Sequence, residues 1–463
     1  MTTTMLGDII RLGASRGLDF VLIDELRKRT GISPGSVLKF ALNEMVCNAL
    51  DKNATHIEVR VEVEGDFDRL TVCDNGSRKL ALNDVKLILD FSKQASSKRG
   101  LLKVSRGYLG NALKCIFGYS YALSEEKGLS PPAIVVKSGG FEHRIALKPN
   151  RLKEIIDSEI VTTETQDDGL TALTVEFPTV GIDAKPLKDF ILAMGMVNPT
   201  RQINYDIFGV ERGTVGSPQE GKSIRQETSV AWYTRKQFEA LFNDFIKARP
   251  ETQLKEFIPL FRGFSSKKII GEILQTLNAV NHDSHAKGGV QFFPATSIMD
   301  MPRWAVSTLF RVLRAKAKPI AKRSTPSVLG CVGEASFQRL CEQNGWQRLR
   351  YAIMPATKTE CPNCYYGAWG VVQRKPCNSE DHVSFPYLVE LAIFDRVEDG
   401  EGLKVYQCVN FAASTEDIFA RIFDISHRLG LAGIREETPV TVVAHLVCPV
   451  LKWLNYGKSG LDE

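Results

Sequence analysis

The stretch EMVCNALD at residues 44–51 decides how the N-terminal part of this chain folds. It lies inside a helical pattern whose apolar positions are Leu38, Ala41, Met45 and Ala49. On the same helix Glu44, Asn48 and Asp51 stand at i, i+4 and i+7. That spacing places an acid, an amide and a second acid on one helix face, which is either solvated or part of a binding site.

Two strand-like segments follow this helix. Residues 55–63 alternate apolar and polar side chains, which is typical of a half-buried strand. A second apolar segment, residues 70–73, runs directly into Asp74-Asn75-Gly76. An aspartate at a strand end can accept a hydrogen bond from a ligand, although the same tripeptide is also typical of a hairpin turn.

A glycine-rich segment, SRGYLGNALK at residues 105–114, precedes the next helical pattern. Backbone N–H groups at a helix start favour phosphate, and nearby basic residues add positive charge, namely Lys98, Arg99, Lys103 and Arg106. A later strand-like segment carries Thr174 and ends at Pro178. Each feature alone is also typical of a turn or a solvated face, so their order along the chain is the informative observation.

This order resembles the Bergerat ATP-binding fold shared by gyrase, Hsp90, histidine kinases and MutL. Residues 44–51 are similar to its N box, Asp74–Gly76 to its adenine-binding Asp-x-Gly, and residues 105–114 to the end of its lid. The resemblance is strongest to the B subunit of topoisomerase VI, a type IIB DNA topoisomerase. Further islands of similarity extend it over about residues 30–460: NPT (198–200), LKEFIPLFRGFSSKK (254–268), TPSVLGCVGE (325–334), FPYLVELAIF (385–394), VNF (409–411), HLVCP (445–449) and YGKSG (456–460).

The resemblance implies an α+β chain of three parts. Residues 1–184 would form a Bergerat ATP-binding α/β sandwich, residues 185–323 a helical segment resembling a helix-two-turn-helix insert, and residues 324–463 a ribosomal S5-like α/β transducer domain. The implied function is that of the ATP-hydrolysing subunit of a topoisomerase VI-like enzyme. It would act as an ATP-dependent homodimer gate on double-stranded DNA, beside a separate Spo11-like, A-type cleavage subunit. Two alternatives are a MutL- or MORC-like ATP-operated clamp without strand cleavage, and an Hsp90-like chaperone.

The resemblance also implies roles for individual residues. Glu44 would be the general base that activates water, and Asn48 would hold Mg²⁺. Asp74 would accept the adenine amino group, with Thr174 beside it, and Lys458 would reach the γ-phosphate of ATP from the third part. The complete ATP-binding set is Asn48, Asp51, Asp74, Gly76, Lys98, Arg106, Gly107, Tyr108, Leu109, Gly110, Asn111, Ala112, Leu113, Lys114, Thr174 and Lys458.

The sequence departs from the family pattern at several places. Arg78 stands where a second glycine usually follows Asp-x-Gly, and Asn111-Ala112 replace part of the lid's glycine pattern. We expect these changes to alter adenine affinity or lid closure. The family's long helix after the transducer lysine is missing, so we expect either a truncated chain or a different coupling to the partner.

Cys361, Cys364, Cys377 and His382 have the spacing C-x₂-C-x₁₂-C-x₄-H, which suits a tetrahedral zinc site. They fall in an expected insertion at residues 355–383. The alternatives are one structural Zn²⁺ and a group of reduced thiols.

The composition of the 463 residues is ordinary for a globular protein, with a formal net charge of +5. This charge permits a nucleic-acid partner without requiring one. A basic run is expected to contact DNA phosphates or to form a solvated helix face, and its members are Arg311, Arg314, Lys316, Lys318, Lys322 and Arg323. Ten cysteines are too sparse for a disulfide scaffold, and the chain begins without a signal-peptide pattern. We expect no membrane association and a cytoplasmic location.

Overall fold

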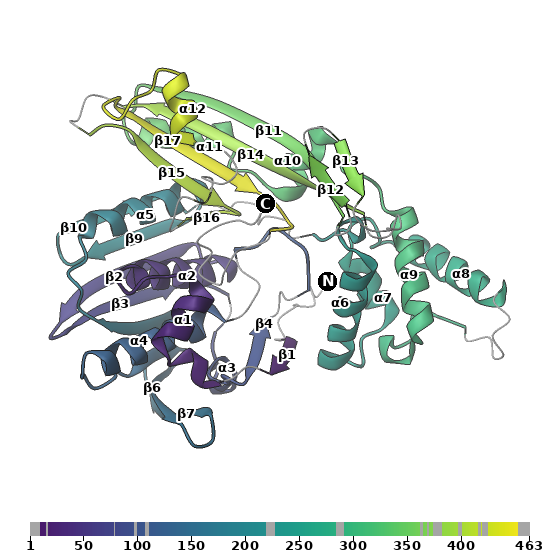
Figure 1. The fold of residues 1–463 in the computed structure, drawn as a ribbon, viewed down its shortest axis with the longest axis horizontal. Coiled ribbons are helices and arrows are strands. Elements are labelled where there is room, and N and C mark those ends of the chain that lie inside the picture. The colour runs from purple at the N-terminus through teal and green to yellow at the C-terminus, as the bar shows by residue number, and fades with distance from the viewer. Residues whose placement is uncertain are drawn as a thin grey trace.

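The computed structural model describes residues 10–14, 17–77, 79–96, 100–106, 111–218, 227–283, 291–361, 364–367, 370–373, 382–396, 401–414, 418 and 425–451. The architecture is mixed α+β, as expected, with two large sheets, two small two-stranded ones and a group of helices beside them in the described residues (Figure 1). Within the described residues, no helix combines the length and the apolar character needed to cross a membrane.

The first unit is built on an eight-stranded sheet in the order β10-β9-β2-β3-β8-β5-β6-β7. Its neighbouring strands are antiparallel except β2 and β9, which run parallel. The strands are β2 (His56–Glu64), β3 (Phe67–Asp74), β5 (Ile134–Ser138), β6 (Phe141–Asn150), β7 (Ile155–Glu164), β8 (Thr171–Pro178), β9 (Gln202–Ile207) and β10 (Glu211–Val215). A separate pair joins β1 (Ile10–Ala14) to β4 (Lys93–Ser96).

Helices cover the face of this sheet to which β2 contributes its buried side chains. These helices are α1 (Ile23–Thr30), α2 (Val37–Asp51), α3 (Leu82–Ile88), α4 (Ala112–Glu126) and α5 (Ala184–Val197). The predicted apolar stripe of α2 is buried throughout, which confirms the helical periodicity. On β2 the alternation holds for Ile57, Val59 and Val61, whereas Val63 is 59% exposed because the strand runs beyond the covering helices.

The first unit extends further along the chain than the sequence suggests. Helix α5 packs closely against β10, where a Cβ on Gly195 would lie 2.2 Å from Val215 Cγ2. Strand β9 pairs in parallel with β2, and β10 pairs with β9. The expected boundary at residue 184 therefore falls too early, because α5, β9 and β10 complete the first sheet and its core.

The helical unit contains α6 (Arg235–Ala248), α7 (Leu254–Phe257), α8 (Lys267–Asp283) and α9 (Arg303–Lys316). Thr234 caps α6 and forms a reciprocal capping box with Gln237. A cluster of aromatic rings fills its centre. The ring centroid of Phe238 lies 5.2–6.0 Å from the centroids of Phe257, Phe261 and Phe310. Edge-to-face and tilted ring pairs of this kind add to the free energy gained by burial. The hydrophobic core around them also includes Leu388 and Val447 of the C-terminal sheet, so the helical unit and that sheet share a core.

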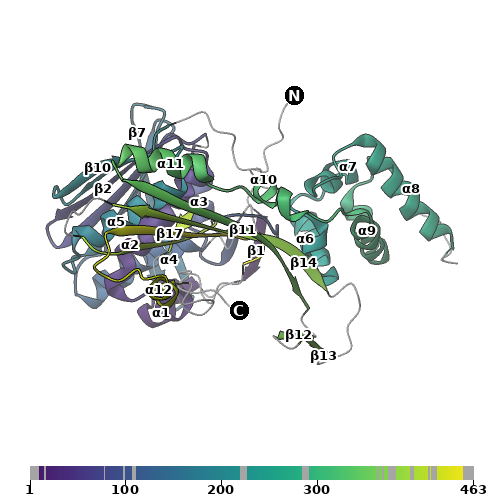
Figure 2. The same cartoon turned by 90° about the horizontal axis from the view of Figure 1, so that it is seen from above.

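The third unit is a five-stranded sheet in the order β11-β14-β17-β15-β16. Its elements are α10 (Thr325–Leu329), α11 (Glu334–Gln343), β11 (Arg348–Glu360), β14 (Val383–Asp395), β15 (Lys404–Val409), β16 (Ala412–Ala413), α12 (Ile425–Leu431) and β17 (Val440–Val447). A small hairpin, β12 (Cys364–Gly367) with β13 (Gly370–Gln373), follows β11. Strands β11 and β14 run over the first unit toward the helical unit (Figure 2).

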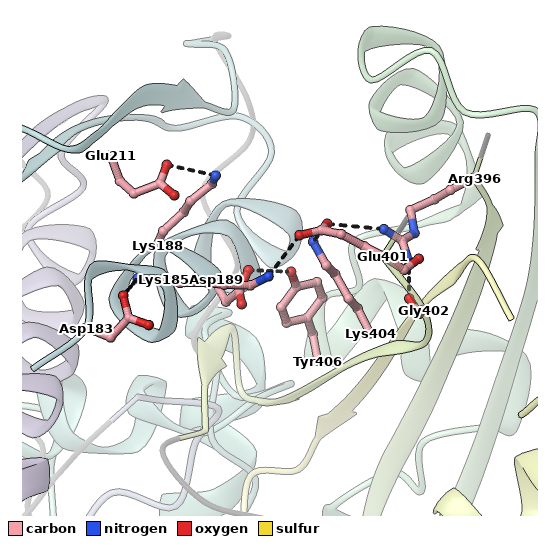
Figure 3. Close-up of polar contacts among 10 residues, drawn as sticks. All are labelled: Asp183, Lys185, Lys188, Asp189, Glu211, Arg396, Glu401, Gly402, Lys404 and Tyr406. Carbon is pink, nitrogen blue, oxygen red and sulfur yellow. Dashed lines mark hydrogen bonds and ion pairs between the residues drawn. The ribbon is translucent and has the colours of Figure 1, made fainter. Parts of the chain in front are cut away.

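Helix α5 joins the first unit to the third. Lys185 on α5 contacts Glu401, which also pairs with Lys404 of β15, and Tyr406 Oη donates to Asp189 Oδ1 at 3.4 Å (Figure 3). Hydrogen bonds from Lys404 and Lys185 lower the pKa of Glu401 to about 2. The C-terminal sheet therefore rests on a helix that also covers the first sheet.

Candidate nucleotide site

The C-terminal half of α2 carries the three polar residues predicted from the sequence. Glu44 is 5% exposed although its side chain is polar, Asn48 is exposed to solvent, and Asp51 lies at the last position of the helix. Burying a carboxylate is costly unless it has a role or a partner. The three residues lie on one helix, and their burial ranges from the exposed Asn48 to the buried Glu44. Their common role in a binding site stays a prediction.

Asp74 ends β3, and the structure shows why Gly76 follows it. Asp74 Oδ1 accepts the Gly76 N–H at 2.8 Å. A Cβ on Gly76 would lie 2.7 Å from Asp74 Oδ1 and 2.7 Å from Lys52 Cβ, so no larger residue fits. The hairpin-turn alternative for this tripeptide is wrong, because β3 is followed by α3 and its sheet neighbours are β2 and β8.

Lys52, which was not among the predicted site residues, contacts Asp74. Its ammonium Nζ donates to Asp74 Oδ2 at 2.5 Å, and its side chain is only 18% exposed. Asp74 is therefore bonded at both carboxylate oxygens. The available signal was the position of Lys52 directly after Asp51, where a lysine suits the negative end of the α2 dipole.

The start of α4 contains a buried side-chain amide without a hydrogen-bond partner among the described residues. Asn111 is the N-cap residue and is 1% exposed, and within the described residues neither its Oδ1 nor its Nδ2 has a hydrogen-bond partner. Buried polar groups are nearly always paired, so this amide is suited to a ligand. Lys114 in the first turn is also buried, and its Nζ donates to the Asp90 carbonyl.

Several predicted ATP-binding residues lie outside the described residues. They are Lys98, Gly107, Tyr108, Leu109, Gly110 and Lys458. Ala112 and Leu113 are described and form the first turn of α4. The predicted roles of all these residues in phosphate binding stay predictions.

The expected position of Thr174 beside Asp74 is wrong. The register of β3 and β8 pairs Asp74 with Thr171 and pairs Thr174 with Thr71. The hydroxyls of Thr174 and Thr71 are 2.9 Å apart on the opposite face of the sheet from Asp74. Thr171, which is 2% exposed and bonded to Ser138, is the threonine that shares the face of Asp74.

Arg106 connects α2 to distant parts of the chain. It is 9% exposed, and its Nη1 lies 3.1 Å from Asp51 Oδ1. Its Nη2 donates to Asn198 Oδ1 at 2.6 Å and its Nε donates to the Phe411 carbonyl at 3.0 Å. The three contacts use the planar fork of the guanidinium, which a lysine could not reproduce.

The proposed zinc ligands are only partly described. Cys361 is buried, and the His382 carbonyl accepts a hydrogen bond from Arg314. Cys377 and the side chain of Cys364 lie outside the described residues. Among the residues that are described, no group of three or more potential ligands could hold a metal ion, so zinc stays a prediction.

The basic run lies on α9 and on the segment that follows it. Five of its members are exposed: Arg311, Lys316, Lys318, Lys322 and Arg323. Lys316 Nζ lies 3.5 Å from Glu272 Oε2, and Arg314 is half-buried over the Phe310 ring. The run thus presents positive charge on the helical unit, as both of the alternatives for it require.

An open pocket of about 320 Å³ lies elsewhere in the first unit. It is lined by α4 and by β5 and β6, with Tyr121, Ile134 and Lys148 among its residues. Its lining includes no predicted ATP-binding residue. It is therefore separate from the predicted ATP-binding residues.

No protein-family model matches the chain, and no curated protein sequence does. Solved structures with a partial likeness include the 43K ATPase domain of Thermus thermophilus gyrase B in complex with an aminocoumarin, at 10% identity and a TM-score of 0.33, covering 91% of this chain and 78% of that one. A topoisomerase IV ATP-binding domain of Francisella tularensis, in complex with a small-molecule inhibitor, gives 9% identity and a TM-score of 0.32. The match covers 92% of this chain and 81% of that one. The B subunit of the Myxococcus xanthus DNA gyrase gives 8% identity and a TM-score of 0.36. The match covers 92% of this chain and 83% of that one. TM-scores this low are too weak to transfer an activity, so a functional proposal has to stand on the residues of this chain.

Proposed function

We propose that this chain binds and hydrolyses ATP at the site formed by the C-terminal half of α2, the end of β3 and the start of α4. The observation that carries the proposal is that residues of three sequence motifs, at 44–51, 74–76 and 105–114, interact at the C-terminal end of α2. Asp74 pairs with Lys52, which caps α2, and Arg106 pairs with Asp51, the last residue of α2. A buried acid, Glu44, lies two turns earlier on the same helix.

The residues present fit a magnesium nucleotide. Asn111 offers a buried, unpartnered amide at the N-terminus of a 15-residue helix, where the helix dipole favours an anion such as phosphate. Asn48 is a neutral oxygen ligand exposed on α2, and Mg²⁺ commonly takes few protein ligands beside phosphates and water. Asp74 would receive the base, in competition with Lys52.

The bound Mg²⁺ would neutralise phosphate charge. The chain itself supplies the proton acceptor, because Glu44 is a carboxylate held in a largely dry position and can take a proton from an attacking water. Asp51 does not act on water in this scheme. It holds Arg106, and its proposed role is to support the site.

The test is the variant Glu44→Ala. Loss of a general base typically costs about 10²–10⁴-fold in turnover, with little effect on nucleotide binding. Calorimetric titration with a non-hydrolysable ATP analogue and a steady-state ATPase assay measure the two quantities. Glu62→Ala, which removes an exposed acid on β2, is the control, and unchanged turnover in Glu44→Ala would refute the role of Glu44.

At a finer level we propose a subunit of a topoisomerase VI-like enzyme, which changes DNA topology together with a separate cleaving subunit. The support is the run of sequence islands and the exposed basic run on α9, whose phosphate contacts would be salt-dependent. The alternative is an ATP-operated DNA clamp that cuts no strand. Co-purification with the products of neighbouring genes, followed by an ATP-dependent supercoil relaxation assay, separates the two.

A further inference from the structure

A two-residue turn of the C-terminal sheet inserts beside the nucleotide site. Strands β15 and β16 pair Val409 with Ala412, so Asn410 and Phe411 are the whole of the loop. Both have positive φ angles, 50° and 65°. Hairpins of this form usually place glycine at the second position, because a Cβ strains the left-handed conformation. The sequence places Phe411 there instead.

Hydrogen bonds hold this strained turn from both sides. Asn410 Nδ2 donates to the Ser105 carbonyl at 3.2 Å and to the Cys448 carbonyl at 2.9 Å. The Phe411 carbonyl accepts from Arg106 Nε at 3.0 Å and from Asn198 Nδ2 at 2.9 Å. Two consecutive residues of the first unit, Ser105 and Arg106, are therefore fixed by two consecutive residues of the C-terminal sheet.

On the other side the Phe411 N–H donates to His445 Nε2 at 3.0 Å. Because Nε2 accepts, the proton of the neutral ring lies on Nδ1, which is 2.9 Å from Glu390 Oε2. His445 and Glu390 are fully buried. Burial raises the pKa of Glu390, but the hydrogen bonds from His445 and from the N–H groups of Gly333 and Val332 outweigh it and leave the pKa lowered.

This set of contacts forms a continuous path. It runs from Asp51 through Arg106 to the Phe411 peptide, and from there through His445 to Glu390. Glu390 in turn accepts hydrogen bonds from the backbone N–H groups of Val332 and Gly333, which lie between α10 and α11. Each member is largely buried, so a lost partner leaves a polar group without water to replace it.

We propose that Arg106 is a positioning residue of the nucleotide site and that the Phe411 peptide of the C-terminal sheet holds it in place. The inference rests on the proposed function. Arg106 contacts Asp51 at the end of α2, so its position bears on the helix that carries Glu44 and Asn48. By reciprocity, a nucleotide that favours this arrangement also stabilises the Phe411 turn.

The test uses Asn198→Asp in the full chain. This variant keeps the Oδ1 acceptor for Arg106 but replaces the Nδ2 donor with an oxygen that faces the Phe411 carbonyl. Asn204→Asp on β9, whose described contacts stay within the first sheet, is the matched control. His445→Phe, which removes the acceptor for the Phe411 N–H and keeps a ring, is the second variant if Asn198→Asp fails to fold.

We expect Asn198→Asp to bind the ATP analogue within about threefold of wild type but to lose about 10-fold or more in turnover, as misplacement does. Amide exchange of the Phe411 N–H should slow when wild type binds the analogue, and this response should be absent in the variant. A purely structural role would lower stability without removing the response. If Asn198→Asp keeps wild-type turnover and the slowed amide exchange of Phe411, the inference is overturned but the proposed function is not. If the wild-type chain does not bind the analogue, both the proposed function and the inference are overturned.

Discussion

Replacing Lys52 with methionine is expected to tighten nucleotide binding while lowering the stability of the nucleotide-free chain. In the structure Lys52 Nζ donates to Asp74 Oδ2, and the two side chains are 18% and 6% exposed. A base that donates an amino hydrogen to Asp74 has to share or displace this ammonium. Methionine keeps the apolar stem that packs near Gly76 and removes only the charge.

The sizes of the two effects follow from the burial of the pair. A hydrogen bond to a charged group contributes about 1.5–3 kcal/mol, and the lower end applies because Lys52 is still partly solvated. Freeing Asp74 should therefore tighten binding roughly 10-fold. Asp74 keeps the Gly76 N–H, so the loss of unfolding free energy should be about 1–2 kcal/mol, below the cost of breaking a fully buried pair.

Calorimetric titration with a non-hydrolysable ATP analogue and urea unfolding measure the two quantities. The control is Lys188→Met, which breaks the more exposed Lys188–Glu211 pair on the far side of the unit and should cost less than about 1 kcal/mol without changing affinity. Tighter binding together with lower stability is the expected signature. Binding that is weaker in Lys52→Met would refute the reasoning, because it would show that the ammonium itself recognises the nucleotide.

Three further outcomes are expected. Protein purified without chelator should carry about one zinc per chain, which Cys364→Ser should lose; metal analysis without zinc would reject that site. Lys458→Ala should abolish the compaction and dimerisation caused by the ATP analogue, measured by small-angle scattering and sedimentation, while nucleotide binding is spared. Glu401 has its pKa lowered from 4.5 to about 2, so its stabilising contribution is complete above pH 4.5 and is lost as the pH falls through about 2. Glu401→Gln should lower the free energy of unfolding at neutral pH slightly and remove an equally small part of the stability lost on acidification, because the side chain is 40% exposed.

Local periodicity was enough to predict α2, β2, β3 and the start of α4. Each of these elements is specified by residues within one helix or strand, so its buried positions repeat at a fixed interval. The same holds for Asp74, whose place at the end of β3 follows from the apolar run before it. A sequence pattern of this kind reports which face is buried, and the structure confirms it.

The residues that the sequence failed to place depend on pairing between distant segments. Thr174 lies 100 residues beyond Asp74, and only the register of β3 with β8 decides that Thr171 takes the position opposite Asp74. The same reason explains the boundary at residue 184, because nothing local marks β9 as the parallel neighbour of β2. The sequence predicts Arg106 only as one of several basic residues near the glycine-rich segment, because its partners Asn198 and Phe411 are remote in the chain.

The charges around the end of α2 explain why these long-range pairs exist. Asp51 stands at the negative end of the helix dipole, where a carboxylate is unfavourable unless a cation such as Arg106 neutralises it. Lys52, at the same end, is favoured by the dipole and neutralises Asp74. Glu44 adds a third carboxylate and Lys114 in the first turn of α4 adds a third cation, so these described groups balance in charge. They leave no excess positive charge for a triphosphate, and its binding would therefore depend on a divalent cation at Asn48 and on the predicted lysines outside the described residues. Nucleotide affinity in this chain should accordingly fall steeply when Mg²⁺ is removed by a chelator, and equal affinity with and without Mg²⁺ would contradict this balance of charges.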